Sequence, residues 1–130
     1  KHSGSWGGIR RKIMRRSMIY EPWDILLVPF PFTDKIERKR RPTVVLSTRD
    51  YNETGFVIVA MITTAHRLDW PSDTPITDLA QAGLPRASVV RLSLSTLDTF
   101  LVQGKLGCLS GVDRERVLAA MQTTVVSSPA

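Results

Sequence analysis

The segment at residues 57–62 constrains the fold more than any other part of this sequence. It reads Val-Ile-Val-Ala-Met-Ile, an unbroken apolar run that is rich in β-branched residues. Such residues favour strands. Because no polar residue alternates with the apolar ones, both faces of the strand are expected to be covered. The sequence therefore predicts a central strand over residues 56–63, against which the rest of the chain packs.

Two further runs are expected to form strands beside it. Residues 23–30 lie between Pro22 and Pro31, and a proline lacks the backbone donor that a strand inside a sheet needs. Residues 43–48 form the second run, and residues 50–55, which hold turn-favouring Asn, Asp and Gly, separate it from the central strand. Together they predict a hairpin, preceded by a strand that leaves its sheet at a proline.

The rest of the chain predicts short strands and one main helix. Residues 87–94 alternate in part, and residues 101–109 contain two glycines that suit bends in a small barrel. Ser110 followed by Asp113 is a helix-capping pattern, and apolar residues recur beyond it at helical spacing. Strands and helices do not alternate. The pattern therefore favours a mostly β (α+β) fold, a small barrel of about five to seven strands with a C-terminal helix.

Composition excludes several classes of protein. The 130 residues, 42% hydrophobic and 23% charged, suit one globular domain. No apolar stretch approaches the roughly 20 residues of a membrane span, and no secretory-signal pattern is present, so a cytoplasmic protein is expected. One cysteine and two histidines cannot form a closed zinc site. No metal or cofactor is expected, and Cys108 is interpreted as a buried core thiol rather than a nucleophile.

The positive charge is unevenly distributed. Residues 1–18 carry six basic residues and no acidic one, whereas residues 19–130 hold twelve of each, within a formal net charge of +6. The first segment is either an arm that adds affinity for phosphate backbones or an extension, and the second interpretation is favoured. The predicted domain is 19–126, with a tail at 127–130. A dense basic cluster at residues 35–41 remains inside the domain.

That cluster supplies the candidate site. The chain has no Gly-rich phosphate loop, paired-histidine metal motif or serine-hydrolase elbow. If residues 43–63 form a hairpin, Arg41 at the start of one strand lies at the same edge as Thr63 and Thr64 at the end of the other. An arginine beside hydroxyl groups suits a phosphate. The alternative is that residues 39–41 are a solvated loop and that Thr63 only favours the strand.

Several segments together resemble the MazF/PemK toxin family. In chain order they are 23–34 (WDILLVPFPFTD), 39–47 (KRRPTVVLS), 57–64 (VIVAMITT), 82–92 (AGLPRASVVRL) and 104–107 (GKLG). The resemblance covers residues 19–126. It implies a homodimer of SH3-like barrels, each with a C-terminal helix. It also implies the toxin of a type II toxin-antitoxin pair, a metal-independent, sequence-specific endoribonuclease (mRNA interferase) that acts on single-stranded RNA.

The resemblance further implies that Arg41 and Thr63 are the catalytic pair. The ribose 2′-OH would attack the adjacent phosphorus and leave a 2′,3′-cyclic phosphate and a 5′-OH. Arg41 would hold the scissile phosphate and stabilise its growing negative charge, and Thr63 would position the 2′-OH or a phosphate oxygen. Thr64 is an alternative to Thr63. His66 is either an acid or base that works near neutral pH or an exposed loop residue.

Base selection is expected to come from loops, because single-stranded RNA is recognised by stacking and by hydrogen bonds to splayed bases. Phe32 and Trp70 are either stacking residues or buried plugs. The predicted RNA-binding residues are Phe32, Arg38, Lys39, Arg40, Thr64, His66 and Arg67.

Three departures from the family pattern bear on this site. Trp23 stands where the family usually has glycine, and we expect it at the mouth of the site, where it blocks RNA or stacks on it. Residues 36–38 replace a small Gly-Ser stretch, which affects loop motion or the sequence that is cut. In the family a basic residue often follows in the segment after Arg91, whereas this chain has Ser-Leu-Ser at residues 93–95, so one phosphate contact is expected to be missing.

Two other functions are compatible with the same barrel: a non-catalytic RNA-binding module, and a toxin that poisons a topoisomerase. The feature that distinguishes them is the pair Arg41 and Thr63, which only the nuclease requires. If the protein is a toxin, its cognate antitoxin is expected to lay an acidic segment over the basic site.

Overall fold

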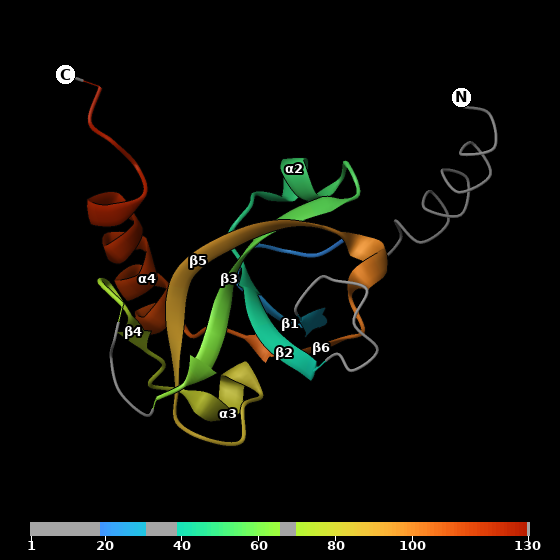
Figure 1. Ribbon diagram of the computed structural model, residues 1–130, viewed down its shortest axis with the longest axis horizontal. Coiled ribbons are helices and arrows are strands. Elements are labelled where there is room, and N and C mark those ends of the chain that lie inside the picture. Colours follow the sequence, from blue (N-terminus) through green and yellow to red (C-terminus); the bar gives the residue numbers. More distant parts are fainter. Residues whose placement is uncertain (1–18, 31–38, 66–69, 130) are drawn as a thin grey trace.

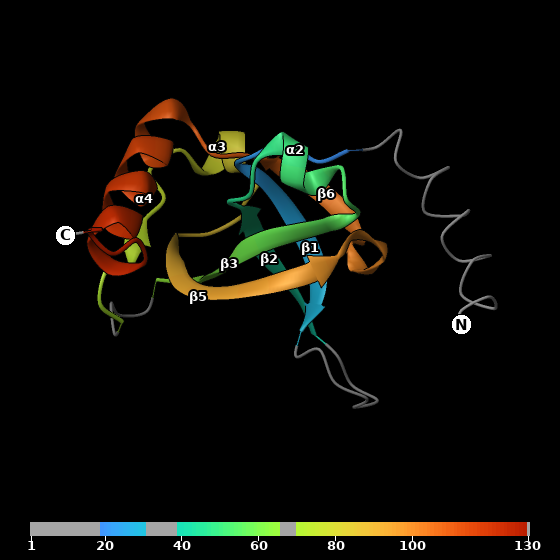
Figure 2. The ribbon, with the colours of Figure 1, turned by 90° about the horizontal axis from the view of Figure 1, so that it is seen from above.

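The computed structural model describes residues 19–30, 39–65 and 70–129. Within these ranges a single antiparallel sheet contains six strands in the order β4-β5-β3-β2-β1-β6. Figure 1 shows the sheet curled on itself, with α4 standing beside it and the short helices α2 and α3 at opposite ends. Figure 2 shows β5 as a long bent strand that runs beside β3, from the side of α4 to the opposite end of the sheet.

The predicted strands and the C-terminal helix occur in the expected order, whereas the two-residue strand at Thr74–Pro75 and the short helices at Arg49–Asn52, Leu79–Ala82 and Thr99–Leu101 were not predicted. The strands are β1 (Asp24–Phe30), β2 (Lys39–Val45), β3 (Phe56–Thr64), β4 (Thr74–Pro75), β5 (Ser88–Asp98) and β6 (Gly104–Cys108). The helices are α2 (Arg49–Asn52), α3 (Leu79–Ala82), the 3-10 helix η1 (Thr99–Leu101) and α4 (Gly111–Thr124). The predicted mostly β barrel-like fold with a C-terminal helix is confirmed. In the described ranges, no helix has both the length and the apolar character needed to cross a membrane.

β3 is the central strand, as predicted, because it pairs with β2 on one side and β5 on the other. Its residues alternate between two hydrophobic clusters. Ala60 and Ile62 belong to one cluster, whereas Val57 and Val59 belong to the other. All four side chains are buried. Because both faces of β3 are covered, neither face requires polar side chains, which explains its unbroken apolar sequence.

The hairpin of β2 and β3 is antiparallel, as predicted, but a helix interrupts its connection. The Thr48 hydroxyl accepts a hydrogen bond from the Tyr51 N–H at 3.2 Å and caps α2. The buried amide of Asn52 donates to the Tyr20 carbonyl at 2.8 Å. These contacts end β2 at Val45, three residues before the predicted end of that strand.

β2 also begins earlier than the sequence predicts. The predicted strand began at residue 43, but Lys39, Arg40 and Arg41 also pair with the last residues of β1, so they are not the solvated loop that was the alternative. The backbone of β1 supplies hydrogen-bond partners at this edge, while the side chains of Lys39 and Arg40 stay exposed. Strand pairing therefore overrides the low strand propensity of these charged residues.

The C-terminal helix is held by a partial form of the predicted capping pattern. The Asp113 N–H donates to the Ser110 hydroxyl at 3.2 Å, as a cap requires. The Asp113 carboxylate instead accepts from the Thr77 N–H and hydroxyl and from the Asp78 N–H, at 2.8–3.2 Å. It therefore fastens α4 to the segment between β4 and α3.

Two details of this region differ from expectation. Cys108 is half-buried rather than a core residue, and the Gln81 amide lies 3.5 Å from its sulfur. The helix α3 was not predicted, although Asp78 caps its start and Gly83 ends it at a φ of 75°. A side chain at Gly83 would clash with the Leu106 carbonyl, since an added Cβ would lie 2.0 Å from that oxygen.

Candidate functional site

The site forms where β2 and β3 part, at Pro42. The Leu46 N–H donates to the Ile58 carbonyl at 2.8 Å, and backbone polar groups alternate in direction along a strand, so Pro42 also faces β3. Proline has no N–H to donate. The pairing of β2 with β3 therefore does not include Pro42, and Thr43 opposite Met61 is the last pair at this end.

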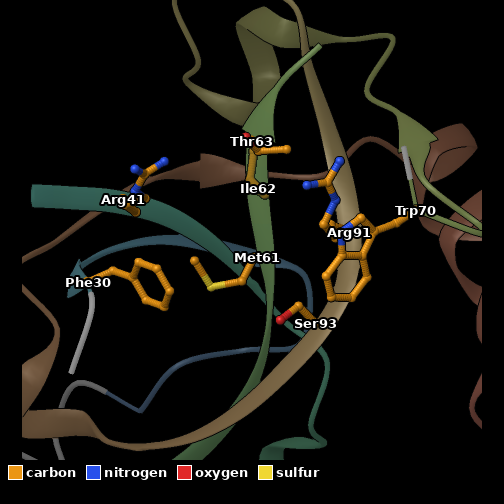
Figure 3. Close-up of a pocket in the computed structure, with 8 residues that line it drawn as sticks. All are labelled: Phe30, Arg41, Met61, Ile62, Thr63, Trp70, Arg91 and Ser93. Atoms are coloured by element: carbon orange, nitrogen blue, oxygen red, sulfur yellow. The ribbon is translucent and has the colours of Figure 1, made fainter. Parts of the chain in front are cut away.

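Arg41 and Thr63 flank the resulting gap. Continuing the register by two residues from Thr43 and Met61 places Arg41 opposite Thr63, on the same face of the sheet. Beyond the gap, β3 stays paired with β5 as far as Thr64. Figure 3 shows β2 with Arg41 turning away from β3, and Thr63 between Arg41 and Arg91. The structure thus brings the two predicted catalytic residues to one edge.

Two hollows meet at this gap, and each has a volume of about 250 Å³. The first, which we call the aromatic hollow, is lined by Phe30, Arg41, Met61, Ile62, Thr63, Trp70, Arg91 and Ser93. The second, the arginine hollow, is lined by Arg40, Arg41, Pro42, Ile62, Thr63, Thr64, Leu84, Pro85, Arg86 and Ser88. Arg41 and Thr63 line both. A chain-like ligand held at these two residues can therefore occupy both hollows.

The surroundings of the Arg41 side chain favour binding of an anion. Its side chain is half-buried, and its guanidinium carbon lies 5.9 Å from the centre of the Phe30 ring. Within the described ranges it forms no ion pair, and its buried Nε has no hydrogen-bond partner. A half-buried cation without a counter-ion gains more from an arriving phosphate than a solvated one.

Arg91, the second arginine of the aromatic hollow, is already neutralised. It forms a two-pronged ion pair with Asp73, with Nε to Oδ1 at 3.1 Å and Nη2 to Oδ2 at 2.8 Å. The Asp73 side chain is only 1% exposed, which makes this pair a fixed part of the structure. Of the two guanidinium groups, Arg41 is therefore the one that is available to a ligand.

The two threonines at the end of β3 occupy different positions. Successive side chains of a strand point to opposite faces, so Thr63 shares the face of Met61 and Thr64 does not. Thr63 lines both hollows, whereas Thr64 lines only the arginine hollow. The geometry thus separates two residues that the sequence left as alternatives.

The other predicted RNA-binding residues are only partly described. Lys39 and Arg40 are exposed at the start of β2, and Arg40 lines the arginine hollow. Trp70 is 46% exposed and is therefore not a buried plug. Four predicted residues lie outside the described ranges, and these are Phe32, Arg38, His66 and Arg67.

Trp23 does not lie at the mouth of the site, contrary to expectation. The register that pairs Val28 with Arg41 puts Trp23 at the opposite end of β1. Its φ of 75° lies in the left-handed region that favours glycine. Its N–H donates to the Val45 carbonyl at 2.7 Å, and its side chain packs against the hydrophobic cluster of Ala60. Trp23 therefore acts in the fold and not in the cleft.

Sequence reasoning missed Asp73, Arg86 and Arg91 as parts of the site. Arg86 and Arg91 had a signal, because both lie in segment 82–92, which carries part of the family resemblance. The ion pair of Asp73 with Arg91 had none, because it depends on how β4 pairs with β5 across 18 positions of sequence. Ser93 reaches the aromatic hollow near an irregularity in the pairing of β3 with β5.

The described residues gather no group of three or more His, Cys, Asp or Glu side chains that is suited to a metal ion. Their cleft is built instead from arginine, hydroxyl and aromatic groups on a curled β-sheet. This combination defines a small β-barrel protein whose cleft has the chemistry that suits a phosphate-containing chain.

The family model of the PemK-like, MazF-like toxins of type II toxin-antitoxin systems matches residues 21–125. The chain belongs to this family. The predicted family is therefore confirmed, and with it the prediction that the protein is a toxin. No curated protein matches the chain significantly.

Solved structures share the fold at low sequence identity. The Mycobacterium tuberculosis toxin MazF-mt6 is 24% identical, with a TM-score of 0.62, and the match covers 77% of this chain and 93% of that one. The MazE-MazF structure from Deinococcus radiodurans is 20% identical, with a TM-score of 0.65, covering 85% and 98%. An endoribonuclease in complex with its cognate antitoxin, from a mycobacterial species, is 14% identical, with a TM-score of 0.65, covering 86% and 99%.

Proposed function

We propose that this toxin is an endoribonuclease that cleaves single-stranded RNA in the gap between Arg41 and Thr63. The observation that carries the proposal is the half-buried Arg41 guanidinium, which has no counter-ion among the described residues and lies opposite a threonine where two hollows meet. That arrangement suits a phosphodiester whose neighbouring nucleotides lie on either side. A structural relative from a mycobacterial species is an endoribonuclease, which supports the same activity.

The proposed reaction is an internal transesterification. The ribose 2′-OH loses its proton to solvent and its oxygen attacks the adjacent phosphorus, the bond from phosphorus to the 5′ oxygen breaks, and that oxygen takes up a proton, so the products are a 2′,3′-cyclic phosphate and a 5′-OH. Arg41 binds the non-bridging oxygens and stabilises the negative charge that grows on them. A guanidinium has donors and no acceptor, so Arg41 donates to the leaving oxygen and does not act as a base. The Thr63 hydroxyl orients the 2′-OH or a phosphate oxygen.

The proposed partners follow from the charge of the cleft. A cognate antitoxin inserts an acidic segment between Lys39, Arg40 and Arg86, and so excludes RNA by charge and shape. MazE bound to MazF from Deinococcus radiodurans supports an antitoxin partner. We also propose that the toxin is a homodimer that acts in the cytoplasm, where its mRNA substrates lie. Light scattering after size-exclusion chromatography measures the oligomeric state.

The test is cleavage of long single-stranded RNA in excess EDTA. The wild-type protein is expected to cut at discrete sites and leave cyclic-phosphate ends. Arg41→Ala removes the main charge stabiliser, and a rate about 100- to 1,000-fold lower is expected. Arg116→Ala is the matched control, because Arg116 is exposed on α4, away from the cleft. Primer extension maps the cut ends.

Three other outcomes would contradict the proposal. RNA that binds but stays intact with the wild-type protein would identify a non-catalytic RNA-binding barrel. Inhibition of a topoisomerase without RNA binding would identify the topoisomerase poison. Equal cleavage by wild-type protein and Arg41→Ala would remove Arg41 from the reaction.

A further inference from the structure

The wall of the aromatic hollow opposite Arg41 is an aromatic ring backed by a cation. The guanidinium carbon of Arg91 lies 5.3 Å from the centre of the Trp70 ring. This is within the range of a cation-π contact. Trp70 nevertheless keeps 46% of its surface exposed, a large fraction for a tryptophan. Arg91 therefore holds the ring while leaving much of its surface to the solvent.

The ring and the cation are both tied to Asp73. The Asp73 carboxylate binds Arg91 by two hydrogen bonds, and the Asp73 N–H donates to the Trp70 carbonyl at 3.2 Å. The turn at residues 70–73 is thereby fixed to β5. Because Asp73 positions both partners, Arg91 through its carboxylate and Trp70 through its backbone N–H, the indole is held before any ligand arrives, and a ligand that stacks on it loses little additional conformational entropy.

The exposed ring faces the proposed reaction. Trp70 lines the same hollow as Arg41 and Thr63, and Phe30 and Met61 complete its apolar wall. Figure 3 shows the indole beside Arg91 and across the hollow from Phe30, with Thr63 above them. A phosphate held at Arg41 would therefore place a neighbouring nucleoside against aromatic and thioether groups. These surfaces suit the flat face of a base.

We propose that Trp70, fixed by Arg91 and Asp73, is the platform on which a base of single-stranded RNA next to the cut phosphate stacks. This inference rests on the proposed function and deepens it by assigning the aromatic hollow to a base. Stacking is tolerant of base identity, because every base has a π-face. Trp70 thus contributes affinity and positions the strand, while Asp73 and Arg91 are positioning residues that act through the ring.

The experiment measures binding separately from cleavage. The probe is an RNA oligonucleotide that contains a mapped cut site, with a 2′-deoxy nucleotide at that site so that it cannot be cleaved. Binding is followed by fluorescence anisotropy of a label on the probe, and by quenching of tryptophan fluorescence when a base stacks on the indole. For the wild-type protein, we expect saturable binding with quenching.

Three variants distinguish stacking from other effects. Trp70→Ala is expected to weaken binding by about 5- to 100-fold, the range that loss of one stacking partner causes. Trp70→Phe keeps a ring, so most of the affinity should remain while the quenching disappears. Phe56→Ala is the matched control, because Phe56 is an exposed aromatic residue at the far end of β3 and does not line the cleft. It should bind and quench as the wild type does.

Four outcomes would contradict the proposed platform. Unchanged binding by Trp70→Ala, or full quenching by Trp70→Phe, would overturn the platform while the cleavage assay still supports the nuclease. Equal losses in Trp70→Ala and Phe56→Ala would assign the effect to general destabilisation and would also overturn it. If the wild-type protein neither binds the probe nor cuts RNA, the proposed function fails, and the platform fails with it.

Discussion

At the scale of single residues, the site depends on which charged groups are already paired. Arg91 lies in the same hollow as Arg41, but Asp73 neutralises it, so one of the two guanidinium groups remains for a phosphate. Side-chain orientation likewise distinguishes Thr63 from Thr64, because alternation along β3 puts only Thr63 on the face of Arg41. Roles at this site therefore follow from pairing and orientation more than from residue type.

The hydroxyl of Thr63 is the group to test at this scale. Thr63→Val removes it at nearly constant volume, and we expect cleavage under single-turnover conditions to slow by about 10- to 100-fold, since a misplaced reacting group costs rate. The KM should change little, because Arg41 still binds the phosphate. Thr96→Val is the matched control, since Thr96 is an exposed threonine on β5. A higher KM with unchanged kcat would show that Thr63 only binds.

At the scale of elements, one proline creates the cleft. Pro42 faces β3 without an N–H, so β2 and β3 part after Thr43 and Met61. The sequence predicted the hairpin and the meeting of Arg41 with Thr63, because the apolar runs and the proline are local signals. It did not predict that β2 begins at Lys39, because that start depends on pairing with β1. It also placed Trp23 wrongly at the mouth of the site, because the true position of that residue depends on the same register.

Restoring the missing donor tests this account of the cleft. Pro42→Val supplies an N–H directed at Ile62, so we expect the ladder between β2 and β3 to lengthen and the gap to narrow. Cleavage should fall, while the fold is retained. Hydrogen exchange of the new amide at position 42, measured by NMR, reports the added bond.

Pro29→Val is the control for that substitution. It also replaces a strand proline, but alternation along β1 points its backbone away from β2, so the gap should stay open. Both variants gain the same backbone freedom in the unfolded state. A fast-exchanging amide at position 42 together with full activity in Pro42→Val would show that other contacts hold the strands apart.

At the scale of the whole molecule, a buried carboxylate on the C-terminal helix binds the segment between β4 and α3. Val117 packs into the hydrophobic cluster of Ile62, and Asp113 accepts hydrogen bonds from Thr77 and Asp78. The helix itself was predictable from its cap and its apolar spacing. Its docking partner was not, because residues 77 and 78 lie in a polar segment without a local signal. Long-range polar contacts of this kind are the part of the fold that the sequence pattern leaves open.

This carboxylate should make stability depend on pH. Burial raises the pKa of Asp113, but hydrogen bonds from the Asp78 N–H and from the Thr77 hydroxyl and N–H lower it, and the net pKa lies below its ordinary value of 3.8. A lowered folded-state pKa means that the ionised group stabilises the fold above about pH 3.8. That contribution is lost as the pH falls through the folded-state value.

Asp113→Asn is therefore expected to lower the free energy of unfolding at pH 7 by about 1–3 kcal/mol, the usual cost of losing hydrogen bonds to a buried charged group. The difference from the wild type should shrink steadily below the ordinary pKa, because the wild-type carboxyl is then protonated too. Urea unfolding followed by circular dichroism at pH 7 and at a series of acid pH values measures both. Glu115→Gln removes the same charge from an exposed site on α4 and should stay within about 0.5 kcal/mol of the wild type. An equal deficit for Asp113→Asn at every pH would assign its effect to packing, and the helix would then be held without the charge.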